Sequence, residues 1–386
     1  MLKKIIEKRN FLNPLKVQSV LFRLQSESSH KLDRERLPYN NRRTELDWSV
    51  EENALQAVVQ QIKKDVLDDQ LEDFIHVPHL RQRYSKLLDK TTFDLPCRYH
   101  SCVLATVHSY LQVEKFGNLT PHQLKLSCIL GWCYRLQVSS MIVYDDILDE
   151  QKVRYNEKPW HKKVGTKEAI LDSLFLKSSA SYLFLRYFES HPQFLNMLKI
   201  FNKCYGTCTV AQMLEIQAHN LKDFKANEVF VKSFPVTLYP VRAAMYLANI
   251  VDPKLHFALD EFCLDLAKFI KVEDDMWGAF EPMTKTHKDC TDVSTGRVTW
   301  LGIQVDKYGT QSQKEKFCEN YGKGGEIAKR DILSVYEEIG IQEHYKTYVE
   351  EFYNTMCEKI EKLPKQLPKQ VFIDLLDFAV IKKFRG

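Results

Sequence analysis

Three aspartates close an apolar stretch of the sequence. The run from Met141 to Tyr144 is followed by Asp145, Asp146 and, after two apolar residues, Asp149. Asp145 and Asp149 are four positions apart, so in a helix they share one face, where their like charges repel and oppose the helix dipole. A hard cation removes both objections, because Mg²⁺ takes carboxylate oxygens and keeps water or phosphate oxygens in its other positions. A solvated helix end is the alternative that this spacing leaves open.

A second acidic cluster follows another apolar helical stretch and contains Glu273, Asp274 and Asp275. Two acid-ended helices that face one another across a bundle can hold metal ions, which grip a diphosphate and neutralise it as a leaving group. Such a site stabilises the charge that develops as a C–O bond breaks. The two clusters together predict a magnesium site with five aspartate ligands: Asp145, Asp146, Asp149, Asp274 and Asp275.

Helices must position these aspartates, and the sequence has helical periodicity in most segments. Leu55, Val58 and Ile62 repeat at this spacing, as do Phe262 and Leu266. Strand-like alternation is nearly absent, and Gly and Pro number only 13 each. We predict an all-α fold, with one large single-domain helical bundle over residues 48–386 and a leader or linker over 1–47, either disordered or a transit peptide. Loops are expected at 92–98, 116–121, 150–166, 221–227, 281–293 and 362–369.

Composition and charge argue against several classes of protein. The 386 residues are 44% hydrophobic and 27% charged, which is typical of a globular chain. A net charge of +4 without a dense basic stripe argues against nucleic-acid binding. No membrane span is expected, since no apolar run approaches the roughly 18 residues that a span needs. The ten scattered cysteines indicate reduced core thiols in a cytoplasmic protein, ahead of disulfides or zinc; the basic first 30 residues leave a mitochondrial location as the alternative.

In combination, these motifs resemble those of the farnesyl diphosphate synthases from about residue 50 to the C-terminus. The matching segments are Leu130-Gly131-Trp132-Cys133, Asp145 to Asp149 with Arg154 and Trp160, Pro240 with Ala243-Ala244-Met245-Tyr246, and Glu273-Asp274-Asp275 with Thr291, Asp292, Arg297 and Trp300. The resemblance implies the all-α isoprenoid synthase (prenyltransferase) fold, a homodimer and three Mg²⁺ ions, two bound by Asp145 and Asp149 and one by Asp274. It further implies that the allylic diphosphate is contacted by Arg154, Lys288 and Arg297, and that Gln212, beside Glu215, contacts a metal-bound water.

The sequence departs from that family where the five-carbon extender, isopentenyl diphosphate, would bind. Counted without gaps, the family's lysine and arginine in its Gly-Gly-Lys-x-x-Arg loop become Tyr99 and Cys102. Its pocket glutamine becomes Val138, and the second arginine of its Arg-Arg pair becomes Tyr155. These side chains cannot replace the charge-assisted donors that a diphosphate needs. The resemblance therefore implies that the extender's binding site is lost.

Basic residues near these positions leave open that the lost contacts are partly replaced. Arg98 and His100 flank the lost lysine position and are basic. The family's helix-break lysine falls on Val231, but Lys232 is next to it, and a shift of one residue restores the contact. Among the aligned positions we therefore keep Lys232 as a predicted substrate contact.

Three further departures concern chain length and metal binding. The two phenylalanines that limit product length in the family become Ser140 and Met141, which implies a deeper pocket for a C15 chain. The last aspartate of the second motif becomes Gly278. Because the missing carboxylate is an outer one in the family, metal binding is expected to persist more weakly.

The kept and lost residues together resemble an insect terpene synthase of the isoprenyl (farnesyl) diphosphate synthase-like family. This implies a sesquiterpene synthase, a lyase that ionises (2E,6E)-farnesyl diphosphate and cyclises it to a hydrocarbon or alcohol, such as a bisabolane-type pheromone precursor. The implied catalytic residues are Asp145, Asp149, Asp274 and Arg154, and the implied substrate contacts are Arg154, Lys232, Lys288, Arg297, Gln212, Ser140, Met141 and Tyr155. Aromatic faces that suit carbocations are offered by Tyr144, Tyr155, Phe234, Tyr239 and Trp277, each of which also suits an ordinary core position.

Two other functions remain open from the sequence. One is a chain-elongating prenyltransferase that makes geranyl or farnesyl diphosphate, for which the extender site is needed. The other is a non-catalytic subunit that regulates an active partner, which the changes at Gly278 and Val231 favour. The kept aspartates count against that reading, since a subunit without activity has no need of carboxylates that repel one another. His161 and His287 are expected at the surface rather than at the site.

Overall fold

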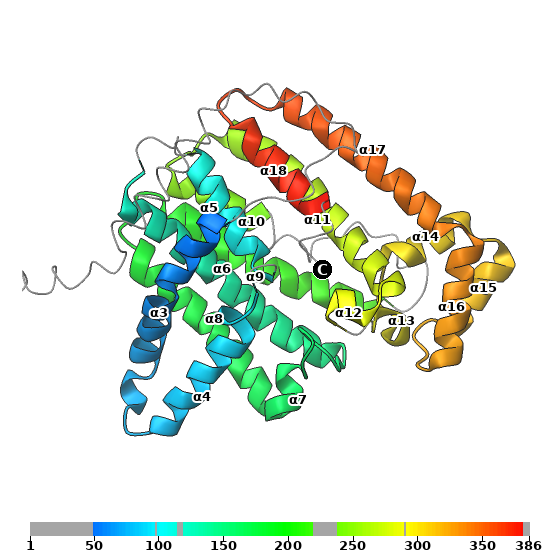
Figure 1. Ribbon diagram of the computed structural model, residues 1–386, viewed down its shortest axis with the longest axis horizontal. Helices are drawn as coiled ribbons and strands as arrows, with labels where there is room; N and C mark the ends of the chain where they lie inside the picture. Colours follow the sequence, from blue (N-terminus) through cyan, green and yellow to red (C-terminus); the bar gives the residue numbers. More distant parts are fainter. Residues whose placement is uncertain (1–48, 97–98, 114–118, 219–237, 289–290, 381–386) are drawn as a thin grey trace, which may run out of the picture.

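The computed structural model describes residues 49–96, 99–113, 119–218, 238–288 and 291–380. Within these ranges every regular element is helical, which confirms the all-α prediction (Figure 1). The longer helices are α3 (Ser49–Gln70), α4 (Pro78–Leu88), α5 (Ser101–Val113), α6 (Pro121–Leu148), α8 (Thr166–Phe188), α9 (Phe194–Gln217), α10 (Leu238–Leu247), α11 (Pro253–Phe280), α15 (Gln311–Asn320), α16 (Glu326–Glu338), α17 (Ile341–Lys362) and α18 (Lys369–Val380). The shorter ones are η3 (Glu72–Phe74), η4 (Asp89–Phe93), α7 (Trp160–Val164), α12 (Met283–Thr286), α13 (Asp292–Thr295) and α14 (Trp300–Tyr308).

Helix α6 is the centre of the bundle and ends at the first acidic cluster. Thr120 and Gln123 form a reciprocal capping box at its start, and Pro121 occupies the first turn. The helix packs against α3, α5, α8 and α10, so most of its side chains are buried. Its burial fixes the direction in which Asp145 and Asp149 project at the C-terminal end.

The expectation that no apolar run reaches the length of a membrane span is wrong at α6. Among the described residues this one helix meets the criteria of length and hydropathy, with a mean hydropathy of 1.3. However, 78% of that window is buried inside the molecule, as in the core helix of a globular protein. Its apolar residues are therefore accounted for by packing against the surrounding helices.

The loop predictions need correction in three places. The segments 150–166 and 281–293 contain the short helices α7, α12 and α13, and 92–98 begins inside the π-helix η4. The segment 221–227 lies outside the described residues. Of the described thiols, Cys102, Cys128, Cys133, Cys204, Cys208 and Cys263 are buried, as the prediction of core thiols requires, while Cys357 is half-buried and Cys318 is exposed.

Gly131 lies where α5 and α6 approach most tightly. A Cβ atom at this position would lie 2.7 Å from Val103 Cγ1 and 3.2 Å from its Cα. We expect Gly131→Ala to lower the free energy of unfolding by about 1–3 kcal/mol, because the backbones must separate. Gly206→Ala on α9 is the matched control: nothing lies within 4 Å of its Cβ, so it should stabilise by about 0.5–1 kcal/mol. Urea unfolding measures both, and equal effects would contradict the close approach.

A buried acid–histidine–acid group joins the first, third and last long helices. His108 on α5 contacts Glu51 of α3 through Nδ1 (3.1 Å) and Asp374 of α18 through Nε2 (2.9 Å). Burial alone would lower the pKa of His108, but the hydrogen bonds to Asp374 and Glu51 outweigh it and raise this pKa to about 9. The imidazolium therefore ties the C-terminal helix to the N-terminal half.

This group predicts a loss of stability at alkaline pH. A pKa raised from 6.5 to about 9 gives a contribution that is complete below pH 6.5 and is lost as pH rises through about 9. Between these limits the free energy of unfolding should fall by about 3 kcal/mol more than in His108→Gln. Urea titrations at pH 6.5, 7.5 and 9 measure this difference, with His76→Gln, at an exposed position, as control. Parallel pH curves for the wild type and His108→Gln would contradict the prediction.

Candidate active site

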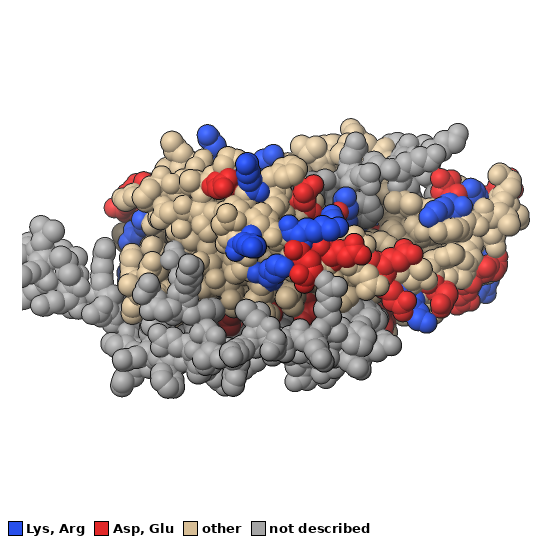
Figure 2. Space-filling view, turned by 90° about the horizontal axis from the view of Figure 1, so that it is seen from above, with Lys and Arg blue, Asp and Glu red and all other residues tan. Residues whose placement is uncertain are grey.

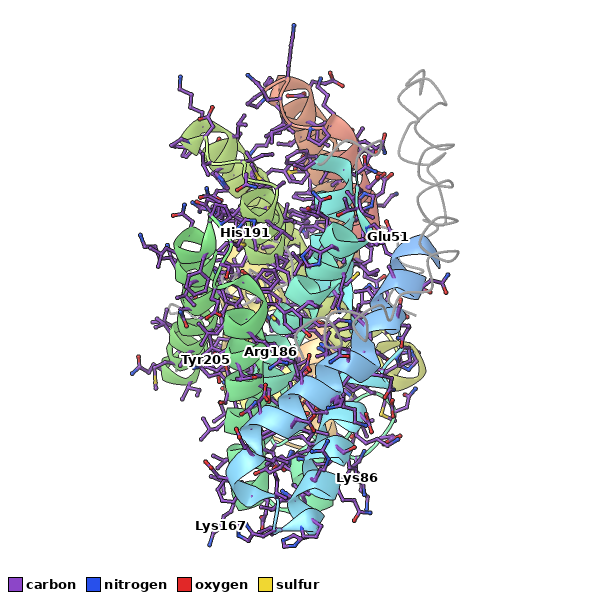
Figure 3. All side chains as sticks on the ribbon, turned by 90° about the vertical axis from the view of Figure 1, so that its left-hand side faces the viewer. Glu51, Lys86, Lys167, Arg186, His191 and Tyr205 are labelled. Carbon is purple, nitrogen blue, oxygen red and sulfur yellow. The ribbon has the colours of Figure 1, made fainter. Side chains whose placement is uncertain are left out.

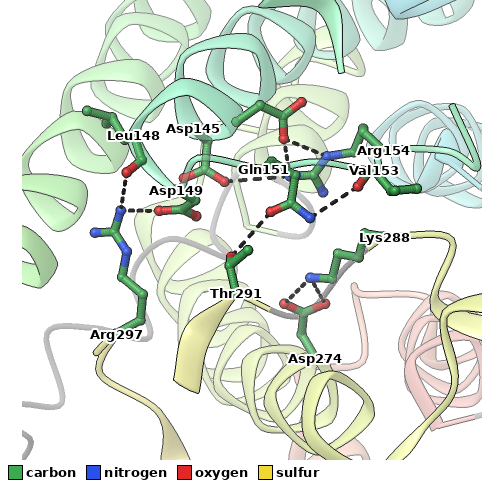
Figure 4. Close-up of polar contacts among 11 residues, drawn as sticks. Asp145, Leu148, Asp149, Gln151, Val153, Arg154, Asp274, Lys288, Thr291 and Arg297 are labelled. Atoms are coloured by element: carbon green, nitrogen blue, oxygen red, sulfur yellow. Dashed lines mark hydrogen bonds and ion pairs between the residues drawn. The ribbon is translucent and has the colours of Figure 1, made fainter. Parts of the chain in front are cut away.

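The first acidic cluster lies at the C-terminal end of α6, as predicted. Asp149 caps this helix, and its backbone N–H donates to the Asp145 carbonyl oxygen at 2.9 Å. Arg297, from the segment before α14, forms an ion pair with the Asp149 carboxylate and donates to the Leu148 carbonyl oxygen at 3.2 Å (Figure 4). A basic side chain from 148 residues further along the chain thus neutralises this helix end.

Asp146 is the most buried of the three aspartates in the motif. It is 2% exposed, and Arg154 donates from Nε to its Oδ1 at 2.7 Å. Burial raises the pKa of Asp146, while the Arg154 guanidinium opposes that shift. Arg154 also lies 4.0 Å from Asp145 Oδ2. Asp146, which the sequence suggested as a metal ligand, is therefore better explained as the residue that positions Arg154.

The second cluster divides in the same way between an exposed and a buried carboxylate. Asp274, six residues before the end of α11, has a side chain that is 47% exposed and accepts from Lys288 Nζ at 2.9 Å on each of its oxygens. Asp275 is 1% exposed, accepts from Lys271 Nζ at 2.5 Å and from the Trp300 backbone N–H at 2.7 Å. Burial raises the pKa of Asp275, and Lys271 opposes it. Asp275 thus holds α14 against α11, so its predicted role as a metal ligand is not supported by this geometry.

The chain segments that follow the two helices bring the clusters together. Arg154 and Lys288 pair through their backbones, and the Asn156 N–H donates to the His287 carbonyl oxygen at 3.1 Å. Thr291 Oγ1 donates to Gln151 Oε1 at 3.3 Å, so the contact continues toward α13. Asp274 consequently lies across from Asp145 and Asp149, with Lys288 and Thr291 between them (Figure 4).

The donor set fits magnesium and a diphosphate by its chemistry. Asp145, Asp149 and Asp274 offer carboxylate oxygens, the ligand type that Mg²⁺ takes, toward one shared space. No group of three or more His, Cys, Asp or Glu within the described ranges is already gathered around a single point. Each of the three carboxylates has a basic neighbour instead, and Arg154, Lys288 and Arg297 are of the type that binds phosphate oxygens. These residues therefore suit a metal and a diphosphate arriving together.

The position of the family's extender site is filled by aromatic and apolar side chains. The rings of Tyr99 and Tyr155 lie with centroids 4.4 Å apart, and Cys102 is 1% exposed. Both tyrosines line a cavity of about 160 Å³ next to Arg154. His100 does not compensate for the lost lysine, since burial and the nearby Arg135 lower its pKa to about 3 and keep it neutral. Arg98 lies outside the described residues.

Arg135 on α6 is a site residue that the sequence analysis missed. It is 2% exposed, and its Nη2 donates to the Thr91 carbonyl oxygen at 3.4 Å and the Tyr155 hydroxyl at 3.3 Å. No carboxylate in the described part of the chain lies within ion-pair distance of it. A buried cation without an acidic partner is costly. An arginine inside an otherwise apolar helical run was the signal that would have found it.

At Ser140, where the family has a phenylalanine, another aromatic side chain occupies part of the space that the phenylalanine would fill. Ser140 Oγ lies 3.1 Å from Ser173 Oγ and 3.2 Å from the Tyr205 hydroxyl, so a tyrosine of α9 reaches the position. Met141 is also buried, and the Tyr205 ring lies 6.4 Å from that of Tyr144. The expected deepening at Ser140 is therefore limited by Tyr205.

The remaining predicted residues have mixed outcomes. Gln212 is buried on α9, and its Nε2 has no hydrogen-bond partner among the described residues, which suits a water-mediated contact. Lys232 and Phe234 lie outside the described residues. The expectation that His161 and His287 lie at the surface is wrong: both are buried, and His287 Nδ1 lies 2.6 Å from Asn156 Nδ2.

The fold and the paired acidic helix ends define an enzyme of the all-α isoprenoid synthase class. A family model described as "Polyprenyl synthetase" matches residues 100–339, and the chain belongs to this family. Farnesyl pyrophosphate synthase of Gallus gallus is 26% identical over 321 residues, covering 80% of this chain and 88% of that protein. Farnesyl pyrophosphate synthase of Nezara viridula is 27% identical over 282 residues, covering 71% of this chain and 70% of that protein.

Solved structures confirm the fold. The T. brucei farnesyl diphosphate synthase complexed with risedronate superposes with a TM-score of 0.78 at 20% identity. The superposition covers 87% of this chain and 99% of that one. The same protein complexed with the bisphosphonate BPH-722 has a TM-score of 0.79. At this identity the likeness establishes the architecture, whereas the reaction must be argued from the site.

Proposed function

We propose that this protein ionises farnesyl diphosphate and cyclises it to a sesquiterpene, releasing diphosphate. The observation that carries the proposal is the Tyr99–Tyr155 pair, with ring centroids 4.4 Å apart where the family's extender would need cations. Phenol rings offer no charge-assisted donors to a diphosphate, and the thiol of the buried Cys102 offers none either. An allylic cation formed without an extender has only its own double bonds to react with.

The acid-rich site supplies what ionisation needs. Arg154, Lys288 and Arg297 would bind the diphosphate oxygens, and the carboxylates of Asp145, Asp149 and Asp274 would hold Mg²⁺. When bound, the metal supplies positive charge that stabilises the leaving diphosphate. Asp146 holds Arg154 in place, and the paired segments around Lys288 keep the two helix ends at a fixed separation. Such preorganised charge lowers the barrier to breaking the C–O bond.

The apolar part of the site would then fold the isoprenoid chain. Ser140, Tyr144 and Tyr205 lie on adjoining faces of α6 and α9, next to the acidic end of α6. Tyr144 and Tyr205 present aromatic rings near that end, and such faces stabilise a delocalised cation. Holding the chain so that its reacting carbons approach would favour ring closure. The pocket shape therefore sets the product.

A second candidate is chain elongation by condensation with isopentenyl diphosphate. The comparisons favour it over cyclisation, because the relatives named above are farnesyl pyrophosphate synthases. Arg135 favours it as well, since its guanidinium lies 3.3 Å from the Tyr155 hydroxyl, beside the place where an extender diphosphate would need a cation. For Arg135 to reach a ligand in the cavity, the Tyr155 ring would have to move aside.

One incubation distinguishes the two candidates. The purified protein with Mg²⁺ is given farnesyl diphosphate alone, or geranyl diphosphate with isopentenyl diphosphate, and the products are separated by gas chromatography with and without phosphatase. Cyclisation predicts volatile sesquiterpenes from the first mixture and little consumption of the extender in the second. A longer prenyl alcohol after phosphatase treatment of the second mixture would reverse this conclusion. No product from either mixture would favour the non-catalytic subunit.

We also propose that the protein is a homodimer formed through α8 and α9. Five residues connect these helices, and Phe184 of α8 stacks on Phe201 of α9 at 4.6 Å between centroids. Their outer face exposes large apolar side chains at Ile170, Leu171, Leu174, Val210, Met213 and Leu214. Such a patch is typical of a protein interface. Sedimentation velocity should give a dimer for the wild type and a monomer for Leu171→Asp/Met213→Asp, and a monomeric wild type would refute the proposal.

A further inference from the structure

A second hollow opens beside the cavity of Tyr99 and Tyr155. Its volume is about 560 Å³, and it shares Lys90, Glu157, Trp160 and Lys163 with that cavity. The rest of its wall comes mainly from one face of α4: His79, Gln82, Arg83 and Lys86, with Val164 of α7. None of these residues belongs to the acid-rich site, so the hollow needs an explanation of its own.

The wall of this hollow carries four cationic side chains and one carboxylate. Arg83 donates to the buried Asp172 at 2.6 Å, and Trp160 Nε1 donates to the same oxygen at 2.7 Å. Asp172 therefore fixes the positions of both side chains. Lys163 forms an ion pair with Glu157, the one carboxylate in the wall. Lys86 and Lys90 have no carboxylate within ion-pair distance in the described part of the chain. The hollow therefore has an excess of positive charge.

The local backbone gathers these charges. Arg83, Lys86 and Lys90 follow one another at spacings of three and four, so they share a helical face on which like charges repel. Lys90 lies in the π-helix η4, a rare turn that is frequent at functional sites. Thr92 in the same turn donates to Ser139 Oγ at 2.8 Å, which fixes the turn against α6. Figure 3 shows Lys86 on α4, at the same end of the bundle as Lys167 at the start of α8.

We propose that this hollow is a binding site for a diphosphate group, separate from the acid-rich site. Lys86, Lys90 and Lys163 would bind its oxygens as point charges, and the indole of Trp160 would form the wall behind it. A doubly or triply charged anion removes the repulsion along α4, as a single carboxylate cannot. The inference does not rest on the proposed cyclisation, since it concerns binding and holds for either reaction.

The diphosphate group has two possible sources, which share this chemistry. One is the inorganic diphosphate released by ionisation, which would pass from the cavity of Tyr99 and Tyr155 into this neighbouring hollow. The other is the head group of an intact prenyl diphosphate, whose chain would lie along Val164 and Trp160. Inorganic diphosphate and farnesyl thiodiphosphate, which ionises poorly, serve as probes for the two.

The test is calorimetric titration of the full-length protein with each probe in the presence of a chelator. A Lys288→Gln/Arg297→Gln background weakens the acid-rich site, so that the remaining binding reports on the hollow. Adding Lys86→Ala/Lys90→Ala should weaken that binding about tenfold or more. The matched control removes two exposed lysines elsewhere, Lys199→Ala/Lys323→Ala. Circular dichroism checks that each variant is folded.

The outcomes separate clearly. Weakening by the α4 pair and not by the control pair supports the site, and a preference for one probe identifies the source. Equal weakening by both pairs would mean that net charge alone attracts the anion, which overturns the proposal. Unchanged binding in Lys86→Ala/Lys90→Ala overturns it too. An enzyme that proves to elongate chains leaves this result unaffected, so the two proposals fail separately.

Discussion

Asp145→Asn should lower the rate of prenyl diphosphate ionisation by about a thousandfold while leaving the fold intact. Asp145 is one of the three carboxylates that face the shared space, and its side chain remains 26% exposed. On the proposed function, removing its charge would weaken metal binding at the point where the leaving group develops negative charge. The measurement is release of diphosphate from farnesyl diphosphate with Mg²⁺ in excess.

The melting temperature distinguishes this loss of activity from a loss of the fold. Asp145 repels Asp146 and thereby raises the pKa of the Asp146 carboxyl group. Only burial raises this pKa more. We therefore expect the melting temperature of Asp145→Asn to match or slightly exceed that of the wild type. Asp73→Asn, at an exposed position of η3, is the matched control for both measurements. Near-normal turnover by Asp145→Asn would show that the metal site has been assigned to the wrong carboxylates.

The acidic clusters could be predicted because they depend on local spacing. Asp145 and Asp149 share a helical face wherever α6 is placed. An apolar run that is followed by acidic residues also indicates that a helix ends at a polar site. The different orientations of the two adjacent aspartates in each cluster could not be predicted in this way. Asp146 and Asp275 are adjacent in sequence to exposed carboxylates but point inward, toward Arg154 and toward Lys271 and Trp300. Only Lys271, four residues before Asp275, was a local signal.

Contacts between distant segments account for the other corrections. The Tyr205 hydroxyl reaches Ser140 from 65 residues away, and no spacing rule connects the two. His287 is buried because the chain after α12 pairs with the segment after α6. On the face in Figure 2, Lys and Arg side chains lie next to Asp and Glu side chains.

Arg135 bears on the predicted loss of the extender's binding site. That prediction rests on positions that hold cations in the family, where this chain has Tyr99, Cys102 and Tyr155. The structure adds a guanidinium from α6, covered by Tyr155. Whether the region can accept a diphosphate thus depends on the two rings in front of Arg135 more than on the number of cations nearby.

Tyr99→Lys/Tyr155→Arg should therefore convert the protein toward chain elongation. Replacing the rings puts two cations beside Arg154 at the cavity wall, where charge-assisted donors can bind a second diphosphate. We expect condensation of isopentenyl diphosphate with an allylic partner to rise about a hundredfold over the wild type, with release of volatile products reduced. Radiolabelled isopentenyl diphosphate measures the first, and gas chromatography measures the second.

The control keeps the rings and removes only the hydroxyl groups. Tyr99→Phe/Tyr155→Phe should not gain condensation, because it preserves the stack and adds no charge. The charged variant is expected to be less stable, since the new arginine would lie near Arg135, so its melting temperature must be measured before its activity is interpreted. If the wild type already condenses the extender as fast as the charged variant, Tyr99 and Tyr155 do not exclude it, and Arg135 must bind the diphosphate with both rings present.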